Sequence, residues 1–380
     1  MFREFAGWRM LAVGTASLAI AACTAVPKQP AAPPPVAQPA PDVLPTDTAR
    51  HRVALLVPTS GANAQVGQSI ANAATMALLD TNATNLRVTT YDTATNPAEA
   101  ARTAVKDGNR LILGPLLSSD IPAIVAVAEP AKIPLIAFSN DEAAATRSVY
   151  VMGNLPSQSV SRSVAYAAGR GIKTFAALVP LGEYGQRASS ALMLAAKANG
   201  GSVVAMESYD RSNASLAAAA RKTTERGGYG AVLIADGGRM ASTAAPLLKP
   251  GTVKMIGTEL WSGEKAITTT KALDGAWFSA VADTRFGQFS DSYRKRFGTN
   301  PYRIATLGYD AVLLSLRVAR EWKPGSVFPI GKLTEKGGFL GLDGAFRFSK
   351  IGVVERALEV REVRGGALVT VSPAPSRFED

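Results

Sequence analysis

Residues 51–79, HRVALLVPTSGANAQVGQSIANAATMALL, join a short apolar run to a helical pattern. The run at 53–58 has the length and composition of a buried strand. After it, apolar residues recur at the spacing of one helix face: Val66, Ile70, Ala73, Ala77 and Leu78. A buried strand followed by such a helix is the repeating unit of a parallel sheet covered by helices on both faces. This stretch therefore predicts an α/β fold.

The same unit returns along the chain about every 20 to 30 residues, as βα units do. Further apolar runs lie at 86–92, 110–115, 134–139, 149–154, 174–180, 202–210, 231–237, 253–259 and 276–281. Between the first two of these, Asn96 is a predicted N-cap, Pro97 stands at the first helical position and Gly108 lies past the end. The apolar helix expected at 303–322 belongs to the core. The series divides into two similar halves near 151–160, which predicts two lobes.

The N-terminal residues have the pattern of a secretory signal. Arg3 and Arg9 precede an uncharged run at 10–22, which is too short to cross about 30 Å of hydrocarbon. Residues 20–22, Ile-Ala-Ala, stand directly before Cys23 and resemble the lipobox of bacterial lipoproteins, whose cysteine is acylated. We therefore expect residues 1–22 to be removed and Cys23 to carry the lipid anchor. The alternative is an ordinary signal peptide, with Cys23 discarded or buried.

The segment 24–50 is expected to be a disordered tether, because it contains eight prolines and almost no bulky apolar residue. If largely polyproline-like, it reaches about 80 Å. Thr24 after Cys23, rather than an aspartate, resembles lipoproteins that are sorted to the outer membrane. These features predict a protein on the periplasmic face of that membrane.

Composition argues against catalysis. With one cysteine and one histidine, the chain cannot assemble a cysteine–histidine metal site or a serine–histidine triad, and it has no phosphate-binding glycine loop or nucleophile elbow. We expect no enzyme activity, no metal and no cofactor. The net charge is +11, or +10 without residues 1–22, and favours an anionic polymer, a membrane surface or an acidic protein face. Export excludes nucleic acid.

Three stretches, 51–78, 111–141 and 178–204, resemble type 1 periplasmic binding proteins, the leucine/isoleucine/valine-binding protein-like family. The resemblance implies two Rossmann-like lobes, a ligand cleft and three interlobe crossings. It implies that lobe 1 comprises 51–152 plus 280–325, and lobe 2 comprises 153–279 plus 326–372. Residues 373–380 are expected to be a flexible tail.

Within that fold, three short sequences resemble penicillin-binding protein activators: GPLL at 114–117, IPLIAFSND at 133–141 and VYVMGNLPSQSV at 149–160. That resemblance implies a non-catalytic outer-membrane lipoprotein that binds and stimulates a peptidoglycan synthase, a bifunctional penicillin-binding protein. The alternative is the solute-binding receptor of an importer for branched-chain or other amino acids. An outer-membrane anchor favours the activator, because an importer's receptor docks at the inner membrane.

Ligands of open α/β sheets bind at the carboxyl ends of the strands. The polar residues that follow the predicted strands are Ser60, Ser118, Ser119, Ser139, Asn140, Tyr184, Asp236 and Glu259. This set suits a zwitterion, an amino-acid-like molecule or a wall peptide: serines and a helix start for a carboxylate, acids for an ammonium. Resemblance to the amino-acid receptors implies ligand contacts at Ser118, Tyr184 and Glu259. The alternatives are a helix cap at Ser119, a turn at 139–140 and a hinge contact for Tyr184.

Overall fold

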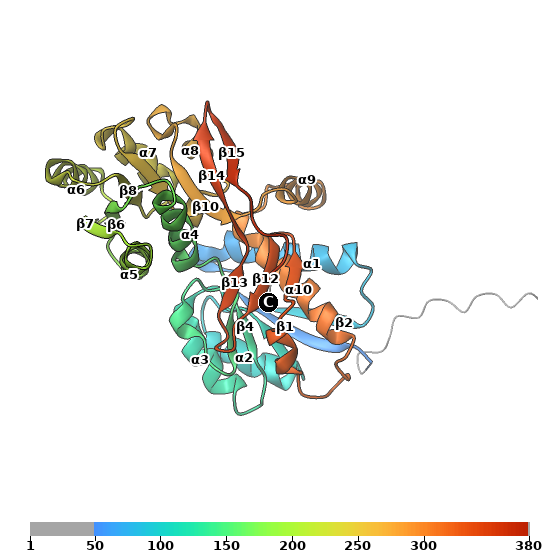
Figure 1. Cartoon of the computed structure of the whole chain (residues 1–380). Coiled ribbons are helices and arrows are strands. Elements are labelled where there is room, and N and C mark those ends of the chain that lie inside the picture. The colour runs from blue at the N-terminus through green and yellow to red at the C-terminus, as the bar shows by residue number, and fades with distance from the viewer. Residues whose placement is uncertain (1–48, 379–380) are drawn as a thin grey trace, which may run out of the picture. The chain divides into compact units, whose positions relative to one another are not determined.

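Two large sheets and a small third one organise residues 49–378, the part of the chain that the computed structural model describes (Figure 1). The expected signal, the anchor at Cys23 and nearly all of the tether lie outside the described residues, as do the last two residues of the expected tail. Across the described range, every helix is too short or too polar to cross a bilayer.

The first sheet has five parallel strands in the order β2-β1-β3-β4-β5. Its strands are β1 His51–Val57, β2 Leu86–Asp92, β3 Leu111–Leu113, β4 Leu135–Ala137 and β5 Val149–Val151. The helices that follow the first three strands are α1 Ala64–Asp80, α2 Pro97–Lys106 and α3 Ile121–Ala128. The Asn96 side chain accepts a hydrogen bond from Glu99 N, which confirms the predicted cap of α2.

The second sheet has seven strands in the order β15-β14-β10-β9-β8-β6-β7. Its parallel strands are β6 Thr174–Pro180, β7 Ser202–Tyr209, β8 Ala231–Ile234, β9 Lys254–Gly257 and β10 Trp277–Val281, and β14 Leu358–Arg364 and β15 Ala367–Ser372 are antiparallel additions. Its helices are α4 Pro156–Ala168, α5 Glu183–Ala198, α6 Asn213–Arg226, α7 Gly238–Ala244 and α8 Lys265–Thr269. The ten predicted apolar runs correspond to β1 through β10.

The chain passes between the two lobes three times, after β5, after β10 and after Arg356. After β10 it forms α9 Phe286–Phe297 and α10 Thr306–Ala319, both of which contact α1. It continues into a three-stranded antiparallel sheet of β11 Phe339–Gly341, β12 Gly344–Phe348 and β13 Val354–Arg356. The α/β fold of two parallel-sheet lobes is thus confirmed.

The last crossing differs from the expected one, in which residues 326–357 belong to lobe 2. Their buried side chains Phe328, Leu333, Phe346 and Phe348 instead pack into the core of the first lobe. A backbone bridge also joins Val353 to Val151 of β5. Burial of these aromatic rings against the first sheet keeps the segment there, and only β14 and β15 reach the second sheet.

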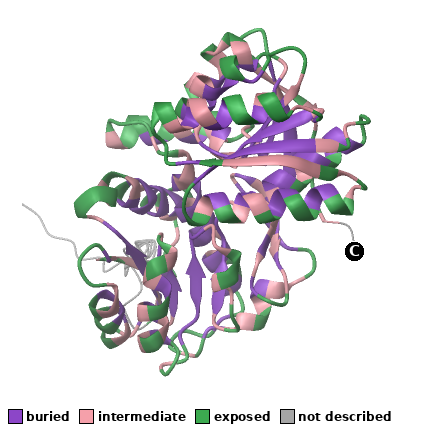
Figure 2. Ribbon diagram, turned by 90° about the vertical axis from the view of Figure 1, so that its left-hand side faces the viewer, coloured by how far each residue is buried: buried purple, intermediate pink, exposed green. Residues whose placement is uncertain are grey.

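Burial follows the layered pattern that the sequence predicts. Figure 2 shows buried strands in the middle of each lobe and helices with one buried and one exposed side. Val53 through Val57 of β1 are fully buried, as a parallel strand covered on both faces requires. Trp322, expected in the core, stacks on His51 with ring centroids 4.3 Å apart, so that the chain's single histidine is an internal packing residue.

Candidate functional site

The eight candidate residues stand where six strands end, and the structure divides them between the two lobes. Ser60, Ser118, Ser119, Ser139 and Asn140 follow strands β1, β3 and β4 of the first sheet. Tyr184, Asp236 and Glu259 follow strands β6, β8 and β9, which are adjacent in the second sheet. Their value as ligand contacts depends on which of these side chains have polar atoms left unpaired.

Tyr184 and Glu259 form a buried pair. The Tyr184 hydroxyl donates to Glu259 Oε1 at 2.9 Å and lies 2.8 Å from Thr258 Oγ1. The other carboxyl oxygen of Glu259, Oε2, is buried and has no hydrogen-bond partner among residues 49–378. An unpaired buried oxygen is costly, and a donor that reached this atom would remove that cost.

Burial sets the protonation of this pair. It raises the pKa of Glu259 from 4.5 to about 7, and the Tyr184 hydroxyl, the Glu259 backbone N–H and the Ser159 side chain only partly oppose the rise. Burial and the nearby carboxyl also raise the pKa of Tyr184 well above its usual value, so the phenol stays neutral. Glu259 therefore changes charge near neutral pH. A cation placed beside it would favour the ionised form.

Asp236 is already satisfied by its own lobe. Its Oδ2 accepts from Arg211 Nε at 2.8 Å and from the Tyr209 hydroxyl at 3.0 Å, and its Oδ1 accepts from Gly237 N at 2.9 Å. Both carboxylate oxygens are occupied and the charge is compensated by Arg211. The structure leaves Asp236 much less suited than Glu259 to receive an ammonium.

Asn140 contacts an arginine that the sequence analysis missed. Arg187 on α5 donates from Nη1 to Asn140 Oδ1 at 3.1 Å and pairs through Nη2 with Asp141 Oδ2 at 2.9 Å. The same Nη2 lies 2.8 Å from Glu183 Oε2, one helical turn earlier. The Glu183–Arg187 spacing of four residues was the only local signal for this arrangement. The link to Asp141 joins the second lobe to the first.

The four candidate serines differ in the hydrogen bonds that their hydroxyl groups make. Ser60 donates to Asp92 Oδ2 at 2.6 Å, and Ser139 accepts from Asp141 N at 3.0 Å, as its turn alternative predicted. Ser118 and Ser119 lie in a 3-10 turn before α3, which begins at Ile121 without a side-chain cap, so Ser119 does not cap it. Within the described chain the Ser118 hydroxyl makes no hydrogen bond, whereas Ser119 Oγ lies 3.3 Å from Asp120 Oδ1.

The second-lobe candidates lie in one neighbourhood. Trp261, which ends the turn that Glu259 begins, donates from its indole nitrogen to the Asp236 carbonyl oxygen at 3.0 Å. Asp236 also adds to the electrostatic rise in the pKa of Tyr184. By contrast, no direct side-chain contact in the described range joins Ser60, Ser118 or Ser119 to this group. Over the same range, acidic, histidine and cysteine side chains form no cluster that could hold a metal ion.

A family model described as periplasmic binding protein matches residues 51–367. The chain belongs to this family, and membership implies a periplasmic location. An uncharacterized protein of Rickettsia prowazekii (strain Madrid E) is 32% identical over 142 residues. That match covers 37% of this chain and spans 38% of the relative's length.

Solved structures share the fold at low sequence identity. A solute-binding protein of an ABC transporter from Rhodopseudomonas palustris BisB5, in complex with 3,4-dihydroxybenzoic acid, superposes with a TM-score of 0.70 at 20% identity, covering 87% of this chain and 98% of that one. A branched-chain amino acid transporter substrate-binding protein from Streptococcus pneumoniae, in complex with isoleucine, superposes with a TM-score of 0.65 at 19% identity. The match covers 85% of this chain and 100% of that one. A leucine-binding protein from Thermotoga maritima superposes with a TM-score of 0.66 at 17% identity, covering 85% of this chain and 98% of that one.

Proposed function

We propose that this chain is a non-catalytic periplasmic binding protein that holds a small solute at the carboxyl ends of its strands. The observation that carries the proposal is the buried and unpaired Oε2 of Glu259 beside Tyr184. A ligand N–H or ammonium group placed there satisfies this oxygen and stabilises the charged carboxylate. Membership of the family and the solute receptors among the structural neighbours support the same conclusion.

The favoured solute is amino-acid-like. Glu259 takes its ammonium group, and the Ser118 hydroxyl, unpaired within the described chain, is the partner that the first lobe offers to its carboxylate. Asp236 is not part of this site, because Arg211 already compensates its charge. The S. pneumoniae neighbour holds isoleucine, a molecule of this class. Import of such a solute is the activity we infer for the assembly that the protein serves.

Calorimetry with a panel of amino acids and short wall peptides tests the proposal. A charged hydrogen bond contributes about 1.5 to 3 kcal/mol, so Glu259→Gln should weaken binding by about 10- to 100-fold. Glu225→Gln, an exposed substitution on α6, is the matched control and should bind as the unchanged protein does.

Proton release provides a second readout. Below pH 7, an ammonium that pairs with Glu259 ionises its carboxyl, so the observed heat should depend on the ionisation enthalpy of the buffer. That dependence should vanish in Glu259→Gln. A panel that gives no heat and no thermal shift would exclude the receptor function.

Activation of a peptidoglycan synthase is a second candidate function. The observation that favours it is how many strand-end side chains are paired with the chain itself: Asp236 with Arg211, Asn140 with Arg187 and Ser60 with Asp92. Strand ends whose polar groups are already paired within the chain suit a scaffold that presents a surface. In a reconstituted assay, the protein should raise the polymerisation rate of a bifunctional penicillin-binding protein and make no product alone. A protein that neither binds nor stimulates any synthase of its own organism is not an activator.

The anchor is a separate proposal that both functions can share. The Ile-Ala-Ala-Cys sequence at 20–23 supports acylation of Cys23, and Thr24 supports an outer-membrane destination. Cys23→Ser should leave an unacylated precursor that no longer fractionates with the outer membrane. Recovery of the variant in that membrane at the normal amount would contradict the anchor.

A further inference from the structure

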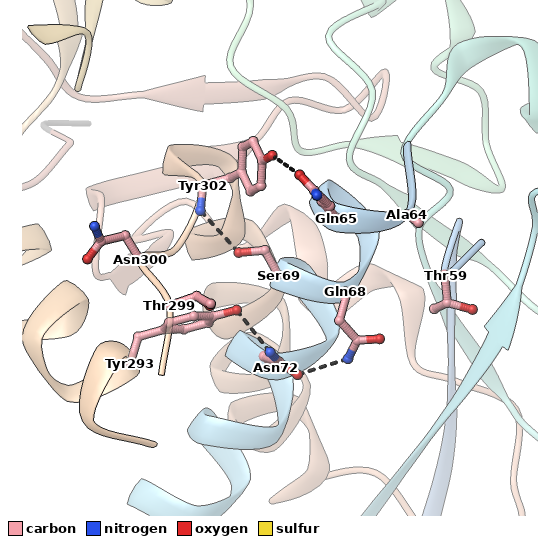
Figure 3. A pocket seen from close by; sticks show the side chains of 10 residues that line it. All are labelled: Thr59, Ala64, Gln65, Gln68, Ser69, Asn72, Tyr293, Thr299, Asn300 and Tyr302. Atoms are coloured by element: carbon pink, nitrogen blue, oxygen red, sulfur yellow. Dashed lines mark hydrogen bonds between the residues drawn. The ribbon is translucent and has the colours of Figure 1, made fainter. Parts of the chain in front are cut away.

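A pocket of about 600 Å³ lies between α1, α9 and the loop after α9 (Figure 3). Residues from α1 form one wall: Ala64, Gln65, Gln68, Ser69 and Asn72. Tyr293 of α9 and the loop residues Thr299, Asn300 and Tyr302 form the other, and Thr59 stands at the edge. None of the eight strand-end candidates lines this pocket. Its volume is that of a site for a small molecule.

The α1 wall is built by helix geometry. Gln65, Gln68, Ser69 and Asn72 are spaced by three and four residues, so they lie on one face of the helix. The opposite side of α1 is apolar and packs into the core of the first lobe through Ile70, Ala74 and Ala77. A helix packed on the core of the first lobe therefore presents a row of four uncharged polar side chains to the pocket.

Internal hydrogen bonds orient these side chains. Gln68 Nε2 donates to Asn72 Oδ1 at 2.9 Å, and Asn72 Nδ2 donates to the Tyr293 hydroxyl at 3.0 Å. Across the pocket, the Tyr302 hydroxyl donates to Gln65 Oε1 at 2.9 Å and its backbone N–H donates to Ser69 Oγ at 3.1 Å. Figure 3 shows the two tyrosines on the side opposite α1.

The pairing leaves a mixed set of donors and acceptors without a partner in the described chain. Gln65 Nε2 and the Tyr293 hydroxyl proton remain as donors, and Gln68 Oε1 remains as an acceptor. The side chain of Asn300 supplies one more of each. Tyr302 is 44% exposed, which leaves part of the residue open to contact.

This chemistry selects a neutral ligand with many hydroxyl groups. All ten lining residues are uncharged, so an ion entering the pocket finds no opposite charge to offset its desolvation. A purely apolar ligand would leave the amides unpaired. A sugar ring offers alternating donors and acceptors to the amides, and its C–H face packs on a tyrosine ring. From this we infer that the pocket between α1 and α9 is a binding site for a neutral saccharide.

Binding of neutral trisaccharides to the full chain tests the inference, with maltotriose, cellotriose and triacetylchitotriose as probes. Saturation-transfer NMR and calorimetry should detect at least one of them. Gln68→Leu combined with Asn300→Ala removes hydrogen bonds and should weaken that binding by about tenfold or more. Tyr302→Phe keeps the ring and should retain more affinity than Tyr302→Ala.

Two control variants distinguish binding in this pocket from binding elsewhere on the protein. Gln288→Leu changes an exposed glutamine on α9 that does not line the pocket, and should leave saccharide affinity and melting temperature unchanged. Glu259→Gln, which alters the proposed solute site, should also leave saccharide affinity unchanged. No binding by any of the three probes would overturn the inference. So would binding that Gln68→Leu with Asn300→Ala does not weaken while the protein remains folded.

Discussion

Arg187 of α5 pairs with Asp141, which follows β4, at 2.9 Å between Nη2 and Oδ2, and the pair joins the second lobe to the first. Both side chains are mostly buried, at 20% and 23% exposure, and Arg187 also holds the amide of Asn140. Residues of the chain thus make a contact between the lobes without a ligand. The contact contributes to the free-energy difference between this arrangement of the lobes and a more open one.

Loss of the Arg187 side chain should favour lobe separation. Arg187→Ala removes the link to Asp141 and Asn140, so small-angle scattering should show a larger radius of gyration. The free energy of unfolding should fall by only about 1 kcal/mol, because the pair is partly solvated. Arg102→Ala, which breaks an exposed pair with Glu99 inside α2, is the control and should leave the radius unchanged. An unchanged radius in Arg187→Ala would show that the pair does not hold the lobes.

Glu259 should make stability depend on pH in the acid to neutral range. Its carboxyl is protonated in both folded and unfolded chains below pH 4.5. Between pH 4.5 and about 7 the unfolded chain ionises and the folded chain does not. Stability therefore falls as pH rises through this window, by up to about 3 kcal/mol, and levels off above it.

The variant Glu259→Gln isolates this contribution. The difference in melting temperature between the unchanged protein and the variant should shrink or reverse sign from pH 4.5 to 7 and stay constant beyond. Glu225→Gln on the exposed face of α6 should show no such trend. A flat difference across the window would mean that the Glu259 carboxyl is ionised normally in the folded protein.

The parts of the fold that depend on short stretches of sequence could be predicted. Each of β1 through β10 is a short apolar run, and the cap at Asn96 is readable from its neighbours. The place of residues 326–357 was not, because Phe346 and Phe348 are buried against strands some two hundred residues earlier in the chain. No local pattern distinguishes that packing from an extension of the second sheet.

The positions of the site residues could be predicted from the sequence, but their hydrogen-bond and ion-pair partners could not. Strand ends pointed to Glu259 and Tyr184, whose adjacency follows from the neighbouring places of β6, β8 and β9. Compensation of Asp236 by Arg211 was missed, because it depends on a loop after β7 in which Arg211 has a positive φ of 67°. Such long-range pairs depend on loop geometry, which composition does not encode.

Arg303 should be essential for the stability of the segment after the second crossing. Its Nη1 pairs with Asp343 Oδ1 at 2.7 Å, and Asp343 is 1% exposed. Asp343 lies beside Asp310, whose pKa is raised first by burial and then by the charge of Asp343. Arg303→Met should leave the buried Asp343 carboxylate poorly compensated and cost about 3 to 5 kcal/mol in urea unfolding.

The matched substitution is Arg294→Met, because Arg294 pairs with Asp291 at the surface with both side chains more than half exposed. It should cost no more than about 1 kcal/mol. Equal losses in the two variants would show that the buried network contributes no more than a surface pair.

Gly153 controls how closely the first crossing approaches the first lobe. A Cβ at this position would overlap the carbonyl oxygen of Ser139, which is backbone and cannot turn away. Gly153→Ala should therefore lower the free energy of unfolding by at least about 2 kcal/mol, through displacement of one of the two segments.

Gly287→Ala is the opposite case, because Gly287 lies in α9 with open space around its Cα. Alanine there should stabilise the protein by up to about 1 kcal/mol. Denaturant unfolding of both variants measures the contrast, and a Gly153→Ala protein as stable as Gly287→Ala would mean that the crossing is not held against Ser139.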